Sequence, residues 1–449
     1  MGQKIDRTYL FERMPVGQAV RRQIIPSIAS QMVILLYNLA DTYFVGLLND
    51  AAQTAAVSLA YSMTLLMTAL ANLFAVGGAG RIAQLLGRRD RDGAREVCAV
   101  SFWFALLASA AFCVLFTLLS SPILRLCGAT DETYALACGY SRWVISVGGT
   151  FSILNTVLAN LIRADGSAFA ASMGVSAGGI INMLLDPLFV LPRFLGMGAE
   201  GAGFATAISN AAGMLILLGI IVARRRVGVV ALRPGDLRAA RRHIGRILRI
   251  GLPSAVQFLL TLVAVGALTK FMSLYDTAAV AALGIVKKLD MLPLYFSIGV
   301  ANGLLPLLAY NYSAENHERR HRIFLCGCAV AVGFSVVCVA GYEVFAPALV
   351  RIFIGDAQTI AYGTKLLRIM VLAMPMMSVC YPMITQFQAM GRMRESLICS
   401  ILRKGSLDIP LLFVLNALFP LYGCAAVQPI VDCICMIVAI YFYKKLPTA

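Results

Sequence analysis

Hydrophobic positions along this chain gather in long continuous runs, and short polar or charged stretches separate the runs. A helix needs about 20 apolar residues to span a bilayer, whereas a membrane barrel would show short alternating strands. The pattern therefore predicts an all-α polytopic membrane protein with twelve transmembrane helices. The predicted spans are residues 24–46, 55–80, 97–119, 137–161, 170–193, 201–223, 248–272, 279–305, 323–347, 362–389, 396–417 and 423–443.

The second half of the chain repeats the first half. One gapless offset places residues 55–95 on residues 281–321. Because six spans per copy is an even number, both copies enter the membrane from the same side, and a pseudo-two-fold axis along the membrane normal relates them. Two such lobes with a cleft between them are typical of an alternating-access carrier. We expect an amino-terminal six-helix lobe over residues 1–223, a basic linker over 224–247 and a carboxy-terminal six-helix lobe over 248–449.

Prolines lie inside several predicted spans. A proline removes one backbone hydrogen bond and tends to kink a helix, and in a membrane the kink survives where neighbours satisfy the freed carbonyl. The sequence therefore predicts weakened points at Pro26, Pro187, Pro253, Pro375 and Pro382.

Composition and the placement of charge narrow the class of protein. Of 449 residues, 60% are hydrophobic and 13% are charged, which is more apolar than a soluble domain needs to be. The net charge of +16 comes from basic residues that crowd the amino terminus, the central loop and alternate loops, as the positive-inside rule predicts. We therefore expect a multi-pass protein of the cell membrane with both termini cytoplasmic. The positive charge suits contact with anionic membrane lipids and not nucleic-acid binding.

Two acidic residues interrupt the apolar spans of the first half. Asp41 lies in the first span and Asp186 in the fifth, whereas the repeat places Asp41 opposite Ala267 and Asp186 near Ile409. Because burying a charge in a membrane is costly, an ionisable residue there is by default a functional-site candidate. The sequence therefore indicates that the first copy has specialised. The alternative is that each carboxylate caps a broken helix or pairs with a basic residue.

Polar residues accompany both acids. Asn182 precedes Asp186 by one helical turn, and Thr206 follows in the next predicted span. Carboxylate, amide and hydroxyl oxygens suit H⁺ or Na⁺ better than a transition metal, so we expect no metal site and no cofactor besides the coupling ion. Burial and mutual repulsion of two carboxylates favour the protonated form, which makes H⁺ the preferred ion. The predicted substrate-cleft residues are Tyr37, Asn38 and Asn155.

The second half carries its own charged residues within predicted spans, and their role stays open at this point. Opposite charges so close together suggest ion pairs. A cationic group there is also able to bind an anionic substrate, or to repel a cation once protons enter. These residues are Lys287, Lys288, Asp290, Arg403, Lys404 and Asp408.

Seven short segments carry a family resemblance. In the first half they are residues 37–46, 162–166, 181–187 and 201–206, and in the second half 251–254, 309–312 and 388–391. At these segments the chain resembles the multidrug and toxic compound extrusion (MATE) family, and the likeness covers nearly the whole chain. The resemblance implies twelve helices in two lobes. It also implies antiport of organic cations or other amphipathic small molecules against H⁺ or Na⁺, here by an expected monomer.

The resemblance assigns roles to single residues. In the family, acids matching Asp41 and Asp186, with an amide matching Asn182, form a cation site in the first lobe. Bending of the first helix near a proline matching Pro26 is proposed to accompany protonation, so Pro26 is the expected hinge. Some members instead carry an acid on the seventh helix. Residues 257–269 of this chain contain none, which favours the first-lobe site.

Two other classes of function remain as alternatives. A flippase of lipid-linked precursors, from the same wider superfamily, would line its cleft with cationic residues such as Lys288 or Arg403. An enzyme finds little support, because the three histidines fall in polar loops and no phosphate-binding loop motif occurs in the sequence. We therefore expect a carrier driven by an ion gradient and not an enzyme.

Overall fold

The computed structural model describes residues 8–48, 50–126 and 131–446, and every regular element in these ranges is helical. The first half forms α1 (Val16–Gly46), α2 (Ala51–Gly87), α3 (Arg91–Leu126), α4 (Asp131–Ser141), α5 (Gly149–Ala164), α6 (Ala168–Val190) and α7 (Gly198–Arg224). The second half forms α8 (Ala240–Met272), α9 (Thr277–Ser313), α10 (His317–Arg351), α11 (Ala357–Val371), α12 (Ala373–Ala389), α13 (Met393–Ile401), α14 (Asp408–Leu418) and α15 (Tyr422–Lys444). Four short helical turns are η1 (Tyr9–Arg13), η2 (Arg142–Val147), η3 (Pro234–Ala239) and η4 (Leu402–Ser406).

These helices confirm the twelve predicted spans. Within the described ranges, nine helices are long and apolar enough to cross a membrane singly. The pairs α4 with α5 and α11 with α12 each form one span, bent by 45° and 42°. α13, η4 and α14 follow one another over the remaining predicted span, residues 396–417, and this stretch breaks at Lys404, where φ is −140° and ψ is 39°.

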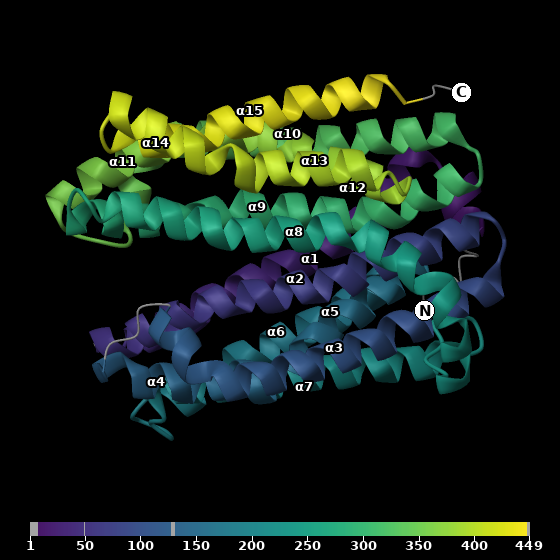
Figure 1. Cartoon of the computed structure of the whole chain (residues 1–449), viewed down its shortest axis with the longest axis horizontal. Coiled ribbons are helices and arrows are strands. Elements are labelled where there is room, and N and C mark those ends of the chain that lie inside the picture. The colour runs from purple at the N-terminus through teal and green to yellow at the C-terminus, as the bar shows by residue number, and fades with distance from the viewer. Residues whose placement is uncertain (1–7, 49, 127–130, 447–449) are drawn as a thin grey trace.

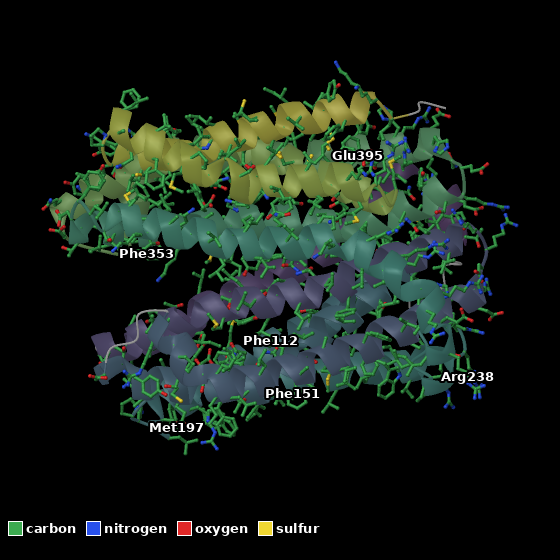
Figure 2. The ribbon with its side chains drawn as sticks, viewed as in Figure 1. Phe112, Phe151, Met197, Arg238, Phe353 and Glu395 are labelled. Atoms are coloured by element: carbon green, nitrogen blue, oxygen red, sulfur yellow. The ribbon has the colours of Figure 1, made fainter. Side chains whose placement is uncertain are left out.

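The helices form two lobes that lie side by side (Figure 1). α1 to α7 make the lower lobe, and α8 to α15 make the upper lobe, which ends in the yellow α15. The lobes lie close together at the end that carries η1, the start of α8 and the end of α15, and they diverge toward α4 and α11. We term the closed end the basic end, because the arginine-rich segment 224–249 lies there, with Arg238 labelled in Figure 2.

Glycines let helices of the two lobes touch backbone to backbone near the basic end. A Cβ at Gly251 of α8 would lie 1.9 Å from the carbonyl oxygen of Leu73 in α2. A Cβ at Gly77 of α2 would lie 2.3 Å from the carbonyl oxygen of Ile247, and one at Gly303 of α9 would lie 2.8 Å from the backbone of α1. Small residues permit such close helix packing in membranes. The two lobes are therefore in direct contact at this end.

The turn η1 bridges both lobes at the basic end. Phe11 is fully buried, and its ring stacks on Tyr310 of α9 with the ring centroids 4.7 Å apart. Arg319 of α10 donates from Nε to the Phe11 carbonyl at 2.8 Å and from Nη2 to the Met14 carbonyl at 2.6 Å. On the first-lobe side, a Cβ at Gly166 would lie 3.2 Å from the Phe11 ring. The segment before α1 therefore packs between the two lobes.

Only one of the two bent spans owes its bend to proline. The break between α11 and α12 falls at Leu372, and the ring of Pro375 would clash with the carbonyl of Val371 in a continuous helix. The break between α4 and α5 falls at Gly148, where a Cβ would lie 2.8 Å from the carbonyl oxygen of Trp143. By contrast, α1, α6 and α8 run on as single helices through Pro26, Pro187 and Pro253.

Candidate cation site

One face of α6 carries two polar side chains, Asn182 and Asp186. Both are buried, with 1% and 0% of their surface exposed. Asn182 Nδ2 donates to Asp186 Oδ1 at 3.3 Å and to Thr206 Oγ1 of α7, also at 3.3 Å. The four-residue spacing places the amide and the carboxylate on the same helix face. The structure therefore brings these three predicted site residues together.

Two glycines allow the neighbouring helices to pack closely beside this polar face. A Cβ at Gly179 would lie 2.7 Å from Val33 Cγ1 and 3.1 Å from Tyr37 Cδ1, both on α1. A Cβ at Gly178 would lie 3.1 Å from the carbonyl oxygen of Ser209 on α7. A larger residue at either position would push α1 or α7 away from the acid on α6.

α1 carries the second acid, Asp41, which is 9% exposed. Asp41 Oδ2 accepts a hydrogen bond from the hydroxyl of Tyr140 on α4 at 3.3 Å. The negative charge of Asp41 acts on Asp186 across the contact between α1 and α6. The sequence did not predict Tyr140, because the contact joins two helices that are distant in the chain and no local spacing marks it.

Three buried oxygens at this site have no hydrogen-bond donor among the described residues. They are Asp41 Oδ1, Asp186 Oδ2 and Asn182 Oδ1. An unpaired buried acceptor costs about 1–3 kcal/mol, and more when it is charged. Neither carboxylate has a basic partner in the described part of the chain, and Asp186 lies within a continuous helix. The arrangement therefore suits a bound proton or a hard monovalent cation better than a helix cap or an ion pair.

The three predicted cleft residues occupy different surroundings. Tyr37 lies beside both acids and is subject to their charges. Asn38 Nδ2 donates to the Tyr295 hydroxyl of α9 at 3.4 Å, so Asn38 faces the second lobe. Asn155 of α5 is 9% exposed, and it packs against α7, where a Cβ at Gly213 would lie 2.9 Å from its Nδ2. Asn38 is therefore the one of the three that forms a side-chain hydrogen bond between the lobes among the described residues.

The predicted hinge, Pro26, lies within the contact between α1 and α9. A Cβ at Gly299 of α9 would lie 2.7 Å from the Ile28 backbone, next to Pro26. The hydroxyl of Ser27 donates to the Gln23 carbonyl at 2.8 Å. A side chain next to the proline therefore forms a hydrogen bond with the helix backbone one turn earlier. At about 1.5 Å of rise per residue, Pro26 is about 22 Å along the helix from the acid on α1.

Charged residues of the second lobe pair with one another. Arg403 Nε donates to Asp432 Oδ1 at 2.8 Å, and the two side chains are 1% and 0% exposed. Lys404 Nζ donates to Gln428 Oε1. Arg403 therefore forms an ion pair within this lobe as expected, but with Asp432 of α15 and not with an acid close to it in the sequence. Its partner was not predicted from the sequence, although Asp432 interrupts the predicted span 423–443 as plainly as the acids of the first half interrupt theirs.

Comparison with known families agrees with this geometry. The family model MatE matches residues 26–188 and 253–414. This chain belongs to the MATE family. The two separate matches fall one in each lobe, which agrees with the internal repeat in the sequence.

Relatives and solved structures match along almost the whole chain. The protein is 28% identical over 437 residues to "Multidrug export protein MepA" of Staphylococcus aureus (strain NCTC 8325 / PS 47), covering 97% of this chain and 95% of that protein. It is 26% identical over 436 residues to the protein of the same name from Staphylococcus saprophyticus, with the same coverage. A structure described as "Outward-facing conformation of a multidrug resistance MATE family transporter of the MOP superfamily" matches with a TM-score of 0.91 and 25% identity, covering 99% of this chain and 98% of that one. The protein is therefore a multi-pass membrane transporter with multidrug-export relatives.

Proposed function

We propose that this protein is a secondary active antiporter that exports lipophilic or cationic organic compounds in exchange for H⁺ or Na⁺. The observation that carries the proposal is the group of three unpaired buried oxygens on Asp41, Asp186 and Asn182. A cation that binds there supplies the missing partner, and its release restores the costly unpaired state. The similarity to multidrug export proteins supports the substrate class.

Asp41 and Asp186 share the coupling ion in this proposal, with Asn182 and Thr206 as neutral partners. The two carboxylates repel each other, so the uptake of one positive charge relieves both burial and repulsion. H⁺ is the favoured ion in this proposal, because burial and mutual repulsion favour the neutral, protonated form of a carboxyl group. A cationic substrate competes with the ion directly for the carboxylates, or indirectly through the shape of the first lobe. Ion and substrate therefore weaken each other's binding reciprocally.

The positive-inside rule places the basic end in the cytoplasm. Because the lobes touch at that end and diverge at the other (Figure 1), the proposal assigns this structure to an outward-facing state. In this state an external ion binds the first lobe and expels the substrate. The ion then leaves on the cytoplasmic side after the lobes rock.

The flippase alternative needs a free cationic group in the cleft. Arg403 does not provide one, because its guanidinium is 1% exposed and paired with Asp432. A buried charge committed to an ion pair has little attraction left for the headgroup of a lipid. The geometry therefore removes Arg403 as the lipid-binding cation of the flippase alternative.

The coupling role of Asp41 is tested by transport in proteoliposomes. An amide at this position cannot exchange a proton, so Asp41→Asn should abolish uptake of a fluorescent lipophilic cation driven by either a pH or a Na⁺ gradient imposed separately. The matched control is Asp92→Asn, since the side chain of Asp92 is 89% exposed in the turn that opens α3. Gradient-driven uptake by a folded Asp41→Asn protein at the rate of the control would refute the assignment.

The orientation is tested by single-cysteine labelling in intact cells. Gly235, in η3 at the basic end, and Gly355, between α10 and α11, both have open space where a side chain would begin. An impermeant maleimide should label Gly355→Cys in intact cells and Gly235→Cys only after the membrane is permeabilised. The opposite labelling pattern would invert the topology and, with it, the facing state of this structure.

A further inference from the structure

The second lobe contains a pocket that the proposed mechanism does not use. It lies between α8, α9, α11, η4, α14 and α15, and its polar lining residues are Lys287, Lys404, Asp408 and Gln428. Asp408 is 7% exposed, and its Oδ2 has no hydrogen-bond donor in the part of the chain that the structure describes. Buried polar atoms in native proteins are nearly always paired, so this acceptor needs an explanation.

Hydrogen bonds relate this pocket to the site in the first lobe. Asn182 of α6 donates to Thr206 of α7, and Lys404 of η4 donates to Gln428 of α15. Lys404 follows Asn182 in the sequence by the same number of positions as Gln428 follows Thr206. The contact therefore recurs in both repeats, with an ammonium group in place of the amide.

This correspondence locates the counterparts of the two acids. The number of positions that separates Asn182 from Lys404 also separates Asp186 from Asp408. Asp408 lies one residue before the Ile409 that the sequence comparison indicated. The gapless offset of the repeat places Asp41 on Ala267, and Ala267 lines the pocket. The second lobe therefore retains one of the two carboxylates and has lost the other.

Lys404 and Lys287 both favour the charged form of Asp408, but Asp290 has the largest charge effect on Lys287, which leaves Lys404 as the counter-charge of Asp408. Among the charged groups, Lys404 stabilises the Asp408 carboxylate most. Asp432 destabilises this carboxylate and Arg403 stabilises it, so these two effects oppose each other. Arg403 and Asp432 form an ion pair of their own at 2.8 Å. The charged groups around the pocket are Lys287 and Asp290 of α9, Arg403 and Lys404 of η4, and Asp432 of α15, and the thiol of Cys424 also lines it.

We propose that Lys404 is a tethered counter-ion, whose ammonium group takes the place in the second lobe that an exchangeable cation takes in the first. The comparison rests on the proposed cation site of the first lobe. There, two carboxylates and an amide require a cation from solution. Here, one carboxylate and an ammonium group are already neutral together, so the pocket recruits no exchangeable cation. The transporter then has a single coupling site, and the second lobe keeps a constant charge through the cycle.

Infrared difference spectroscopy of the purified full-length protein tests this proposal, because a protonated carboxyl has a C=O band that a carboxylate lacks. In the wild-type protein Asp408 is ionised, so Asp408→Asn should remove no protonated-carboxyl band. Lys404→Asn restores the amide of the first lobe and leaves Asp408 without a counter-charge. This variant should gain one protonated-carboxyl band in Na⁺-free buffer, and a second substitution, Asp408→Asn, should abolish the gain.

Two control variants separate charge from side-chain identity. Lys404→Arg keeps the positive charge and should gain no band. Lys288→Asn removes a partly buried lysine of α9 that does not line the pocket, and it should also gain none. If Na⁺ then removes the band gained by Lys404→Asn, the vacated site takes Na⁺ as well as H⁺. The double variant Lys404→Asn/Asp408→Asn should retain ion-driven efflux, because it removes one charge of each sign and leaves the net charge of the pocket unchanged.

A protonated-carboxyl band in the wild-type protein that Asp408→Asn removes would overturn the proposal, whatever the Lys404 variants do. The absence of a new band in a folded Lys404→Asn protein would overturn it too, as would loss of ion-driven efflux in the double variant. Failure of the first-lobe site gives a different result. In that case Asp41→Asn changes neither the bands nor the coupling, while the variants at Lys404 and Asp408 behave as expected.

Discussion

A methyl group added at Gly251 tests whether the contact between α2 and α8 decides which way the transporter faces. The new Cβ would lie 1.9 Å from the carbonyl oxygen of Leu73, 2.7 Å from its carbonyl carbon and 2.9 Å from its Cα. All three are backbone atoms, so no side-chain rotation relieves the clash. The two helices must separate locally by roughly 1 Å to bring the closest contact to about 3 Å.

The expected effect follows from the cost of overpacking, which is about 1–3 kcal/mol. That cost falls on the state in which α2 and α8 touch, and it lowers the population of this state about 5- to 150-fold relative to one in which the helices part. Gly245→Ala is the matched control, because Gly245 lies on the same helix with no atom within 4 Å of its added Cβ. Both variants gain about 0.5–1 kcal/mol of helix propensity, so their difference isolates the clash.

Pulsed electron–electron double resonance between spin labels at Arg88 and Glu318 measures the separation of the lobes at the basic end. Both positions are exposed, one on each lobe. Gly251→Ala should add a population with a longer distance, whereas Gly245→Ala should keep the wild-type distribution. Identical distributions and melting temperatures for the two variants would refute the reasoning. A lower melting temperature for Gly251→Ala without a longer distance would show that the contact persists in both facing states.

Two further substitutions test the packing around buried groups. Arg403→Met should destabilise the protein by about 3–5 kcal/mol, because it leaves the buried carboxylate of Asp432 without its counter-charge. Arg125→Met breaks an exposed ion pair and a cation–π contact with the Tyr134 ring and should cost about 1 kcal/mol, so equal melting temperatures for these two variants would contradict the buried pair. Phe11→Ala removes a fully buried ring between the lobes and should cost about 3–5 kcal/mol, with faster proteolysis of the amino-terminal segment. Tyr9→Ala, at a side chain that is 45% exposed, is its control, and matching protease sensitivity would show that η1 does not hold the lobes together.

The lengths of the hydrophobic runs were enough to predict the spans and the two lobes. In a bilayer the backbone must satisfy its own hydrogen bonds, so a long apolar run has one structural outcome. The same reasoning identified Asp41 and Asp186 as buried acids, and it applies equally to Asp432, which was not predicted from the sequence. Helical spacing predicted the contact between Asn182 and Asp186, because residues four apart always share a helix face.

Contacts between helices were beyond the reach of these rules. The hydroxyl of Tyr140 reaches Asp41, and the close approach of Gly251 to Leu73 joins the lobes, yet neither pair shares a local pattern. The proline rule was also incomplete. α1 runs on through Pro26, whereas the span containing Pro375 bends, and the difference depends on whether neighbouring helices support the continuous form.

The sequence by itself determined which residues lie in the membrane, the duplication of the fold and the spacing of polar groups along each helix. Only the tertiary structure decided which helix faces meet, and therefore that Asp408 with Lys404 stands where Asp186 stands with Asn182. The physical reason is that lipid and apolar side chains are similar surroundings for a helix. Small differences in shape consequently decide which helix faces pack together. The pattern of apolar residues in the sequence does not predict these differences.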